Sequence, residues 1–383
     1  MPVSGLNPRR LTLVLAILLF QTPGSFAQGK KDNAPVLSQS QLEALLKKAP
    51  KSYEAHYQAG RFYQDKGFVG QAQDEYKQAI SCPDAKPEVY KQLANLYLRS
   101  HDYEQAGKVS EAARTKFPND YGVLLTAGYV LHNRQHLAEA LSTYEKARSI
   151  KPAESDIYLA IADVYSSMNK PKEALVSIDK GMKLGASSSD FAHFERAKIL
   201  NNLERYSEAA SEMAPLFDKD PFNPSTNAAY LAALLKCGKL DTALEVRLCM
   251  LAKANGRDMQ INKSEVGALI TQLSEDKVNK AIAGAEKRIS ETKLKARLHF
   301  AMGDVYDRAR SSEAAIKQYE AGLALDSGFA RGYLRLAEDL EYYRHDFSGA
   351  LRNYKKAIEL DPKDRETNMR YSSLKSKLGM KGQ

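Results

Sequence analysis

The chain has 383 residues, enough for two or more ordinary domains or for one extended array of repeats. Its 43% hydrophobic content and 21 tyrosines exclude a chain that is disordered throughout, because enough apolar surface is available to pack. The formal net charge of +9 is spread along the sequence, which indicates a solvated basic surface and allows weak association with anionic surfaces. We expect no nucleic-acid partner.

Residues 1–27 have the pattern of a secretory signal peptide. Arg9 and Arg10 form a basic start, residues 11–20 are an unbroken apolar run, and small residues precede a cleavage point after Ala27. Ten helical residues are too short to cross about 30 Å of hydrocarbon, so an uncleaved anchor is the weaker interpretation. We therefore expect an exported protein, periplasmic or extracellular and from a bacterial envelope, with no transmembrane span after signal removal.

Residues 28–52 are predicted to contain a polar linker and an N-terminal capping helix. The segment SQSQLEALLKKAP, residues 38–50, begins with a serine suited to cap a helix and continues with apolar residues at helical spacing.

An internal repeat follows. Alanine recurs at Ala72, Ala106, Ala140, Ala174, Ala209, Ala243, Ala281, Ala315 and Ala350, in steps of 34, 34, 34, 35, 34, 38, 34 and 35 residues. The corresponding repeats begin at Tyr53, Pro87, Tyr121, Ser155, Asp190, Pro224, Asn262, Ala296 and Ala330. Self-similarity at this period predicts a solenoid of stacked helical units.

Each repeat is predicted to contain two helices. In the third repeat, apolar and small residues follow helical spacing in two runs, Leu124, Ala127, Gly128 and Leu131, then Leu137, Ala140, Leu141 and Tyr144. We expect Gly128 and Ala140 to let the two backbones approach, and Tyr144 to fill the space beside them. Pro152 ends the second helix.

The pattern resembles the tetratricopeptide repeat. The second repeat shows the family's signature as Tyr90, Leu93, Ala94, Tyr97, Ala106, Ala113 and Pro118. The resemblance covers residues 53–364 and implies an all-α, right-handed superhelical solenoid of about nine helix–turn–helix repeats. Residues 53–257 hold repeats one to six, 258–261 an insertion between repeats, and 262–364 repeats seven to nine, of which the seventh is degenerate.

Three places depart from the signature. In repeats six and seven, Arg247 and Ala285 replace the second-helix aromatic, which predicts a bend or a loosened junction. The second helix of repeat nine comes one position late, which predicts an extra residue in its turn. Residues 365–383 are predicted to be a C-terminal capping helix and tail, with Met369, Leu374 and Leu378 as its apolar residues.

No motif for an enzyme active site stands in the sequence, and we expect no catalytic residue, no metal site and no cofactor. His132 and His136 are interpreted as a solvated pair, because the glutamate of a zinc protease motif is missing. The three cysteines, Cys82, Cys237 and Cys249, lack metal-site spacing and are interpreted as small buried fillers.

The family resemblance also implies a binding surface. In this family the first helices line a concave groove, and a partner segment lies against fixed positions of each repeat. Here those positions supply candidate residues in the first five repeats, namely Tyr57, Arg61, Lys91, Asn95, Tyr129, Asn133, Asp163, Lys198 and Asn202. Amides and aromatics suit an extended peptide, although an ordinary polar surface or binding on the convex face remains open.

One specialised form of the groove is not supported. The clamp for acidic chaperone tails matches at Lys91 and Asn95, but its next positions hold Thr126, Asp156 and Ala160. The predicted function is an exported, non-catalytic scaffold that binds a protein or peptide partner. The alternative is a carbohydrate-binding or enzyme-associated module of the cell envelope.

Overall fold

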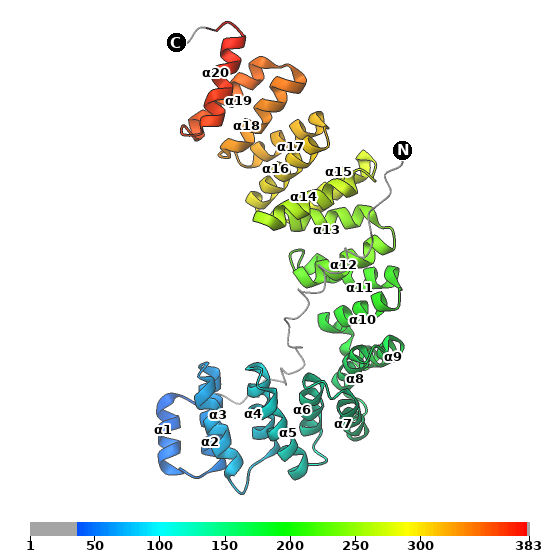
Figure 1. The fold of residues 1–383 in the computed structure, drawn as a ribbon. Coiled ribbons are helices and arrows are strands. Elements are labelled where there is room, and N and C mark those ends of the chain that lie inside the picture. Colours follow the sequence, from blue (N-terminus) through cyan, green and yellow to red (C-terminus); the bar gives the residue numbers. More distant parts are fainter. Residues whose placement is uncertain (1–36, 381–383) are drawn as a thin grey trace. The chain divides into compact units, whose positions relative to one another are not determined.

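The computed structural model describes residues 37–380, and the regular structure of this part of the chain is entirely helical (Figure 1). The prediction of an all-α repeat array is confirmed. The predicted signal peptide and most of the linker lie outside the described residues. Two compact units divide the chain, an N-terminal unit up to Glu204 and a C-terminal unit from Arg205, and each is described by itself.

Helices α2 to α19 alternate between the first and the second helix of a repeat. The first helices are α2 (Tyr53–Asp65), α4 (Pro87–Arg99), α6 (Tyr121–Asn133), α8 (Ser155–Ser167), α10 (Asp190–Asn202), α12 (Pro224–Lys236), α14 (Gly256–Ile270), α16 (Thr292–Arg308) and α18 (Ala330–Asp339). The second helices are α3 (Val69–Ser81), α5 (Tyr103–Lys116), α7 (Leu137–Ile150), α9 (Pro171–Lys183), α11 (Tyr206–Lys219), α13 (Leu240–Lys253), α15 (Glu275–Arg288), α17 (Ser312–Leu325) and α19 (Phe347–Leu360). A short 3₁₀-helix, η3 (Ala186–Ser188), precedes α10.

The first helices begin where the repeat pattern predicts, except for α14 and α16. These two start six and four residues early, at Gly256 rather than Asn262 and at Thr292 rather than Ala296. Residues 258–261, which were predicted to be an insertion between repeats, lie within the lengthened start of α14.

The turns inside the repeats share one backbone geometry. Two positions before the second helix, a residue with positive φ ends the first helix in eight cases, namely Gly67, His101, Gln135, Asn169, Glu204, Gly238, Arg310 and His345. The next N–H then reaches back into the first helix; that of His136, for example, donates to the carbonyl of Leu131 at 2.9 Å. Such a left-handed C-terminal cap satisfies carbonyls that would otherwise lack partners.

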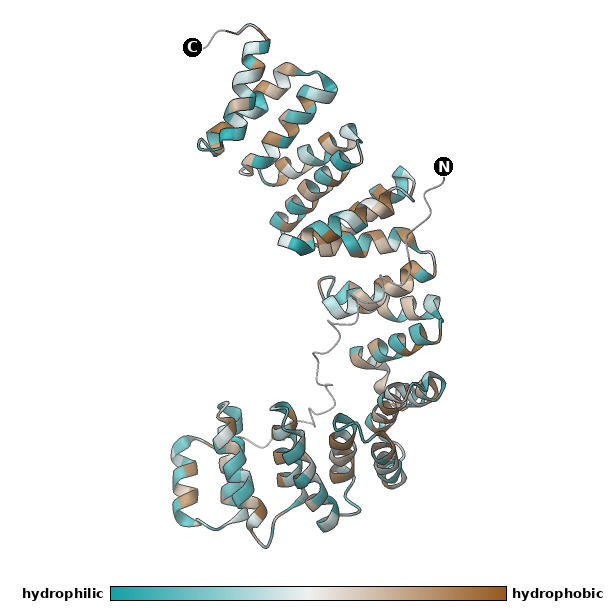
Figure 2. Ribbon diagram, viewed as in Figure 1, coloured by the Kyte–Doolittle hydropathy of each residue, from teal (hydrophilic) through white to brown (hydrophobic). Residues whose placement is uncertain are grey.

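Large and small residues are matched across the helix pairs. At Gly60, Gly128 and Gly303, an added Cβ would collide with the ring of the tyrosine sixteen residues later, which is Tyr76, Tyr144 or Tyr319. The three rings are at most 1% exposed. Hydrophobic and hydrophilic residues alternate along the helices, so that one face of each can be buried in this way (Figure 2). The expected roles of Gly128 and Tyr144 are confirmed.

Helix α13 is the centre of the irregular sixth and seventh repeats. It contacts α12, α14, α15 and α16, and its buried residues include Ala243, Leu244, Val246 and Cys249, which lie on different sides of the helix at about 100° per residue. In place of the usual aromatic, Arg247 forms an ion pair with Glu265 of α14 at 2.7 Å. Because α15 packs chiefly on α13, these two repeats do not form two separate hairpins.

Repeat nine accommodates its extra residue inside a helix. A π-helix, η4 (Leu340–Arg344), continues α18, and the left-handed His345 still stands two residues before α19. The prediction of a longer turn is therefore wrong, because a π-helical turn absorbs one additional residue.

Capping helices flank the repeats. Ser38 accepts the Gln41 N–H at 3.3 Å and donates its own N–H to the Gln41 side chain at 2.9 Å, a capping box that starts α1 (Gln39–Lys48). Helix α20 (Arg365–Lys377) buries only Leu374 of the three predicted apolar residues, since Met369 and Leu378 are exposed. Besides Leu374, only Thr367 of this helix is buried, which is consistent with a helix that keeps its outer face in water.

Candidate functional site

The predicted groove residues all lie on first helices of the N-terminal unit, and these helices contact one another from α4 to α10. The Lys91 side chain of α4 lies against Gly122 of α6, where a Cβ would stand 2.8 Å from its Nζ. Neighbouring repeats therefore bring part of the predicted set together on adjacent helices.

Two members of the set are largely buried. The Tyr57 ring is 6% exposed and stacks on Tyr53 with 5.5 Å between ring centroids. Arg61 is 9% exposed. Both side chains contribute mainly to packing and offer little area to a partner.

Several charged members are paired inside the protein. His132 of α6 lies 3.4 Å from Asp163 and 2.8 Å from the Ser167 hydroxyl, so it links α6 to α8. Lys198 pairs with Glu195 one turn away at 2.8 Å. Burial raises the pKa of Glu195. The His132 contacts connect two helices, whereas the Lys198 pair lies within α10. Both reduce the charge available to a ligand.

The amides differ in how far the protein already uses them. Asn133 donates to the carbonyl of Tyr129 at 2.9 Å, within α6. The Asn95 and Asn202 side chains form no hydrogen bond with another described residue; Asn95 is half-buried and Asn202 is exposed. These two amides retain their full capacity to pair with a peptide backbone.

The histidines and cysteines have structural surroundings. His136 lies 3.4 Å from Glu139, so it does not share a site with His132. Within residues 37–380 no group of side chains is arranged to hold a metal ion. Cys82 and Cys249 are buried and Cys237 is half-buried, all with free thiols. Burial raises the pKa of Cys249 to about 12, which leaves this thiol unreactive.

The C-terminal unit contains a pocket that the sequence analysis did not single out. It has a volume of about 590 Å³ and lies between α14, α16, α17 and α18. Seven of its lining residues come from α16: Lys293 in the first turn, and six more further along, namely Arg297, Phe300, Ala301, Asp304, Asp307 and Arg308. These six are at the same repeat positions that gave the candidates in repeats one to five. Applying the family positions to repeat eight would have identified them.

Positive charge predominates around this pocket. Six cationic side chains line it, Lys263, Lys293, Arg297, Arg308, Arg331 and Arg335, against three carboxylates, Asp304, Asp307 and Asp326. Lys263 forms an ion pair with Asp304, and Arg335 pairs with Glu338 at 2.7 Å. The remaining cations leave an excess of positive charge at the surface of the pocket.

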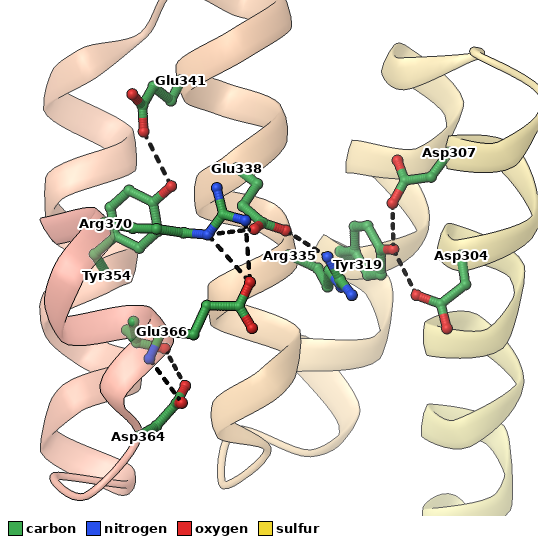
Figure 3. Close-up of polar contacts among 11 residues, drawn as sticks. Asp304, Asp307, Tyr319, Arg335, Glu338, Glu341, Tyr354, Asp364, Glu366 and Arg370 are labelled. Carbon is green, nitrogen blue, oxygen red and sulfur yellow. Dashed lines mark hydrogen bonds and ion pairs between the residues drawn. The ribbon is translucent and has the colours of Figure 1, made fainter. Parts of the chain in front are cut away.

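A network of polar contacts extends from the pocket to the C-terminal cap (Figure 3). The Tyr319 hydroxyl lies 2.9 Å from Asp304 and 2.7 Å from Asp307, so its single proton serves one carboxylate at a time. On the other side, Glu338 lies between Arg335 and Arg370, at 2.7 and 2.8 Å. The network joins α16, α17, α18 and α20 through charged groups.

Two neighbouring carboxyl groups share this environment. Asp339 is 3% exposed, and burial together with the Asp307 carboxylate raises the pKa of Asp339 to about 8. Burial also raises the pKa of Asp307. One oxygen of each carboxyl is buried without a hydrogen-bond partner among the described residues. The pair therefore holds a proton near neutral pH, because two adjacent buried carboxylates repel each other.

These features define a class of protein, a helical solenoid built from helix–turn–helix repeats with polar first-helix surfaces. The family model for the tetratricopeptide repeat matches residues 69–264, and the chain belongs to this family. Tetratricopeptide repeats generally mediate protein–protein interaction. Within the described residues no helix has the length and apolar character needed to cross a membrane.

Individual similarities are more distant. The chain is 22% identical over 324 residues to the human Protein O-mannosyl-transferase TMTC3, over 82% of this chain and 32% of that protein. It thus spans about a third of that relative's length. Among solved structures, pilF of Pseudomonas aeruginosa aligns with 18% identity, covering 59% of this chain and 99% of that chain, with a TM-score of 0.48. A tetratricopeptide repeat protein from Parabacteroides merdae aligns with 15% identity, covering 75% and 98%, with a TM-score of 0.37.

Proposed function

We propose that this protein is an exported, non-catalytic scaffold of a bacterial cell envelope that binds an extended segment of a partner protein on its first helices. The observation that carries the proposal is the surface of the N-terminal unit. There, the first helices α4 and α10 leave Asn95 and Asn202 without a hydrogen bond to another described residue. A peptide backbone offers the donors and acceptors that such amides require.

Family membership supports a binding role rather than catalysis. The transferase name of the human relative concerns a protein about three times as long, of which the matched part is a minority. We therefore assign no transferase activity to this chain. Export rests on the N-terminal sequence pattern, and N-terminal sequencing of the native protein should begin at Gln28. An intact Met1 in native material would contradict export with cleavage.

The binding test replaces Asn95, Asn133 and Asn202 together by alanine. Each lost hydrogen bond should cost about 0.5–1.5 kcal/mol, so the triple variant should bind roughly tenfold to a thousandfold more weakly if the effects add. Folding should survive, because none of the three side chains is fully buried. The measurement is capture of partner proteins from the native envelope, after circular dichroism shows equal helicity.

A matched control changes three exposed polar residues on second helices, Gln71, Gln78 and Ser142, to alanine. The control should capture the partner as the wild type does. Unchanged capture by the Asn95, Asn133 and Asn202 variant would move the binding site away from these first helices. Binding of glycans instead of proteins in a parallel screen would favour the carbohydrate-binding alternative.

A further inference from the structure

The pocket of the C-terminal unit contains four cations that form no ion pair with a described carboxylate. Arg297 donates to the Ala254 carbonyl at 2.6 Å and to the Asn255 side chain at 2.8 Å, and Arg308 donates to Gln260 at 2.7 Å. These acceptors are uncharged, so they position the two guanidinium groups without cancelling their charge.

The other two cations have even fewer contacts. Lys293 lies in the first turn of α16 and Arg331 in the first turn of α18, and both are exposed. Neither forms a hydrogen bond or an ion pair with another described residue. A cation in the first turn of a helix also opposes the helix dipole, so neither charge is favoured by its own helix. Arg331 interacts electrostatically with Asp364, while Lys293 has no such partner among the described residues.

The acidic residues of the pocket already have partners. Asp304 pairs with Lys263 and accepts from Tyr319, and Asp307 also accepts from Tyr319. Asp326 accepts the backbone N–H of Gly328 at 3.1 Å. Of the three carboxylates, only Asp304 forms an ion pair, because the donors to Asp307 and Asp326 are uncharged. The four cations Lys293, Arg297, Arg308 and Arg331 outnumber these two remaining carboxylates, so the pocket keeps net positive charge for a ligand.

An aromatic pair lies beside these charges. The rings of Phe300 and Phe329 have centroids 4.4 Å apart, and Phe329 remains 37% exposed in the wall of the pocket. Gly332 lets its helix approach the Phe300 ring closely, because an added Cβ there would stand 2.8 Å from that ring. An exposed ring next to unpaired cations suits a ligand that has both apolar and anionic groups.

We infer that this pocket binds an acidic segment of the partner protein, with carboxylates against Lys293, Arg297, Arg308 and Arg331 and an aromatic or large aliphatic side chain against Phe329. The inference rests on the proposed scaffold function and adds the chemistry of the partner. A peptide fits better than a free phosphate or polyphosphate, because a phosphate would leave the aromatic wall uncovered. The volume of about 590 Å³ is in the range of pockets that enclose a ligand.

The experiment titrates the full chain into three fluorescein-labelled peptides of equal length, built from repeats of Glu-Glu-Phe, Glu-Glu-Ser or Lys-Lys-Phe. Fluorescence anisotropy should show the Glu-Glu-Phe peptide binding about tenfold more tightly than the Glu-Glu-Ser peptide, with no saturable binding of the Lys-Lys-Phe peptide. Raising the salt concentration should weaken the acidic peptides, since exposed charges are screened.

The pocket variant combines Lys293→Glu with Arg331→Glu. Both sites are exposed first-turn positions where an acidic residue is favourable, so the helices should persist. The control variant combines Arg352→Glu with Lys355→Glu, two exposed positions on α19 that make the same change in net charge. We expect the pocket variant to bind the Glu-Glu-Phe peptide at least about tenfold more weakly, and the control to stay within about twofold of wild type. Phe329→Ser should remove the advantage of the Glu-Glu-Phe peptide over the Glu-Glu-Ser peptide.

Equal weakening in the two charge variants would overturn the inference, because it would reduce the effect to net charge. Binding of polyphosphate in preference to the Glu-Glu-Phe peptide would overturn it too. Partner capture separates this failure from that of the scaffold. If the wild type and the pocket variant recover the native partner equally, the pocket is not the binding site for the partner, and the proposed scaffold function is retained. If the wild type recovers no partner, the proposed scaffold function is rejected. The peptide titration still decides whether the pocket selects acidic segments.

Discussion

The N-terminal and C-terminal units both pack a tyrosine ring on a glycine where two helices cross, but they differ in the polar contacts of the tyrosine hydroxyl. Tyr144 and Tyr319 occupy the same repeat position, and each ring covers a glycine, Gly128 or Gly303. Tyr144 forms no hydrogen bond with another described residue, whereas the Tyr319 hydroxyl meets Asp304 and Asp307. The comparison shows that the repeat requires a ring of this size at the helix crossing, and that the second unit attaches a charged network to it.

The two units also differ in regularity. The first helices of the N-terminal unit all begin at the predicted residues, and each is followed by the same left-handed turn. In the C-terminal unit, α14 and α16 are longer, α13 contacts four other helices, and η4 interrupts the α-helical geometry. Deviations from the repeat therefore occur in the unit that contains the charged pocket.

The largest expected effect tests whether the packing of the N-terminal unit is local. Tyr144→Ala removes a fully buried ring and should cost about 3–5 kcal/mol, because the cavity beside Gly128 cannot close fully. Repeats contact mainly their neighbours, so hydrogen exchange should accelerate in α4 to α9 and stay unchanged in α16 to α20. The exposed Tyr343, changed to alanine, serves as the control and should have little effect. Uniform acceleration throughout the chain would contradict the solenoid interpretation.

The next effect is a pH dependence of stability that arises from the proton held by Asp339 in the C-terminal unit. Asp339 faces Asp307 of α16 and lies near Arg335 and Glu338 of its own helix, and its pKa is raised to about 8. In the unfolded chain an aspartate releases its proton near pH 4, so between about pH 4 and pH 8 the folded state holds the extra proton. The free energy of unfolding should therefore fall as pH rises through this window, by at most about 1.4 kcal/mol per pH unit from this group.

Urea unfolding followed by circular dichroism at pH 6 and pH 8 measures this dependence. Asp339→Asn keeps a neutral side chain at both pH values, so its midpoint should fall less than that of the wild type. Asp326→Asn, at a carboxylate that is not paired with another acid, should retain the wild-type dependence. Equal shifts in all three proteins would exclude the carboxyl pair as the source.

The smallest effect compares the two tyrosines directly. Tyr319→Phe removes the hydroxyl whose single proton is shared between two carboxylates and should cost about 1.5–3 kcal/mol, as expected for a hydrogen bond to a charged group. Tyr144→Phe removes a hydroxyl without such a partner and should cost under about 1 kcal/mol. Hydrogen exchange in α16 to α18 and in α6 to α8 would report the two changes separately. Similar losses in the two variants would show that the contacts of the Tyr319 hydroxyl with Asp304 and Asp307 add no stability of their own.

Much of the architecture could be predicted from the sequence. The alanine period placed the start of most first helices, because small residues are required wherever two backbones cross. Ser38 indicated the N-terminal cap, because its side chain can accept from a free N–H group at a helix start. The pairing of Gly128 with Tyr144 followed from the same spacing. These features depend on contacts between residues that are close in sequence.

The candidate site was less predictable. The nine groove residues were placed on the expected helices, yet Tyr57 and Arg61 are largely buried, and Asp163 is occupied by His132. A repeat position indicates on which helix face a residue lies, but it does not show which neighbouring side chains bury that residue or pair with it. The binding role of the groove stays a prediction.

What the sequence alone determined is thus the local part of the protein, the all-α repeat, its phase, its N-terminal cap and its small-residue crossings, since each is set within one or two helices. Only the tertiary structure decided that α13 is enclosed by four helices, that the extra residue of repeat nine enters η4, and that six cations surround one pocket. The raised pKa of Asp339 likewise follows from the tertiary structure and could not be predicted from the sequence. These features depend on burial and on charges brought together from α14, α16, α17 and α18, and neither is encoded in the spacing of any single repeat.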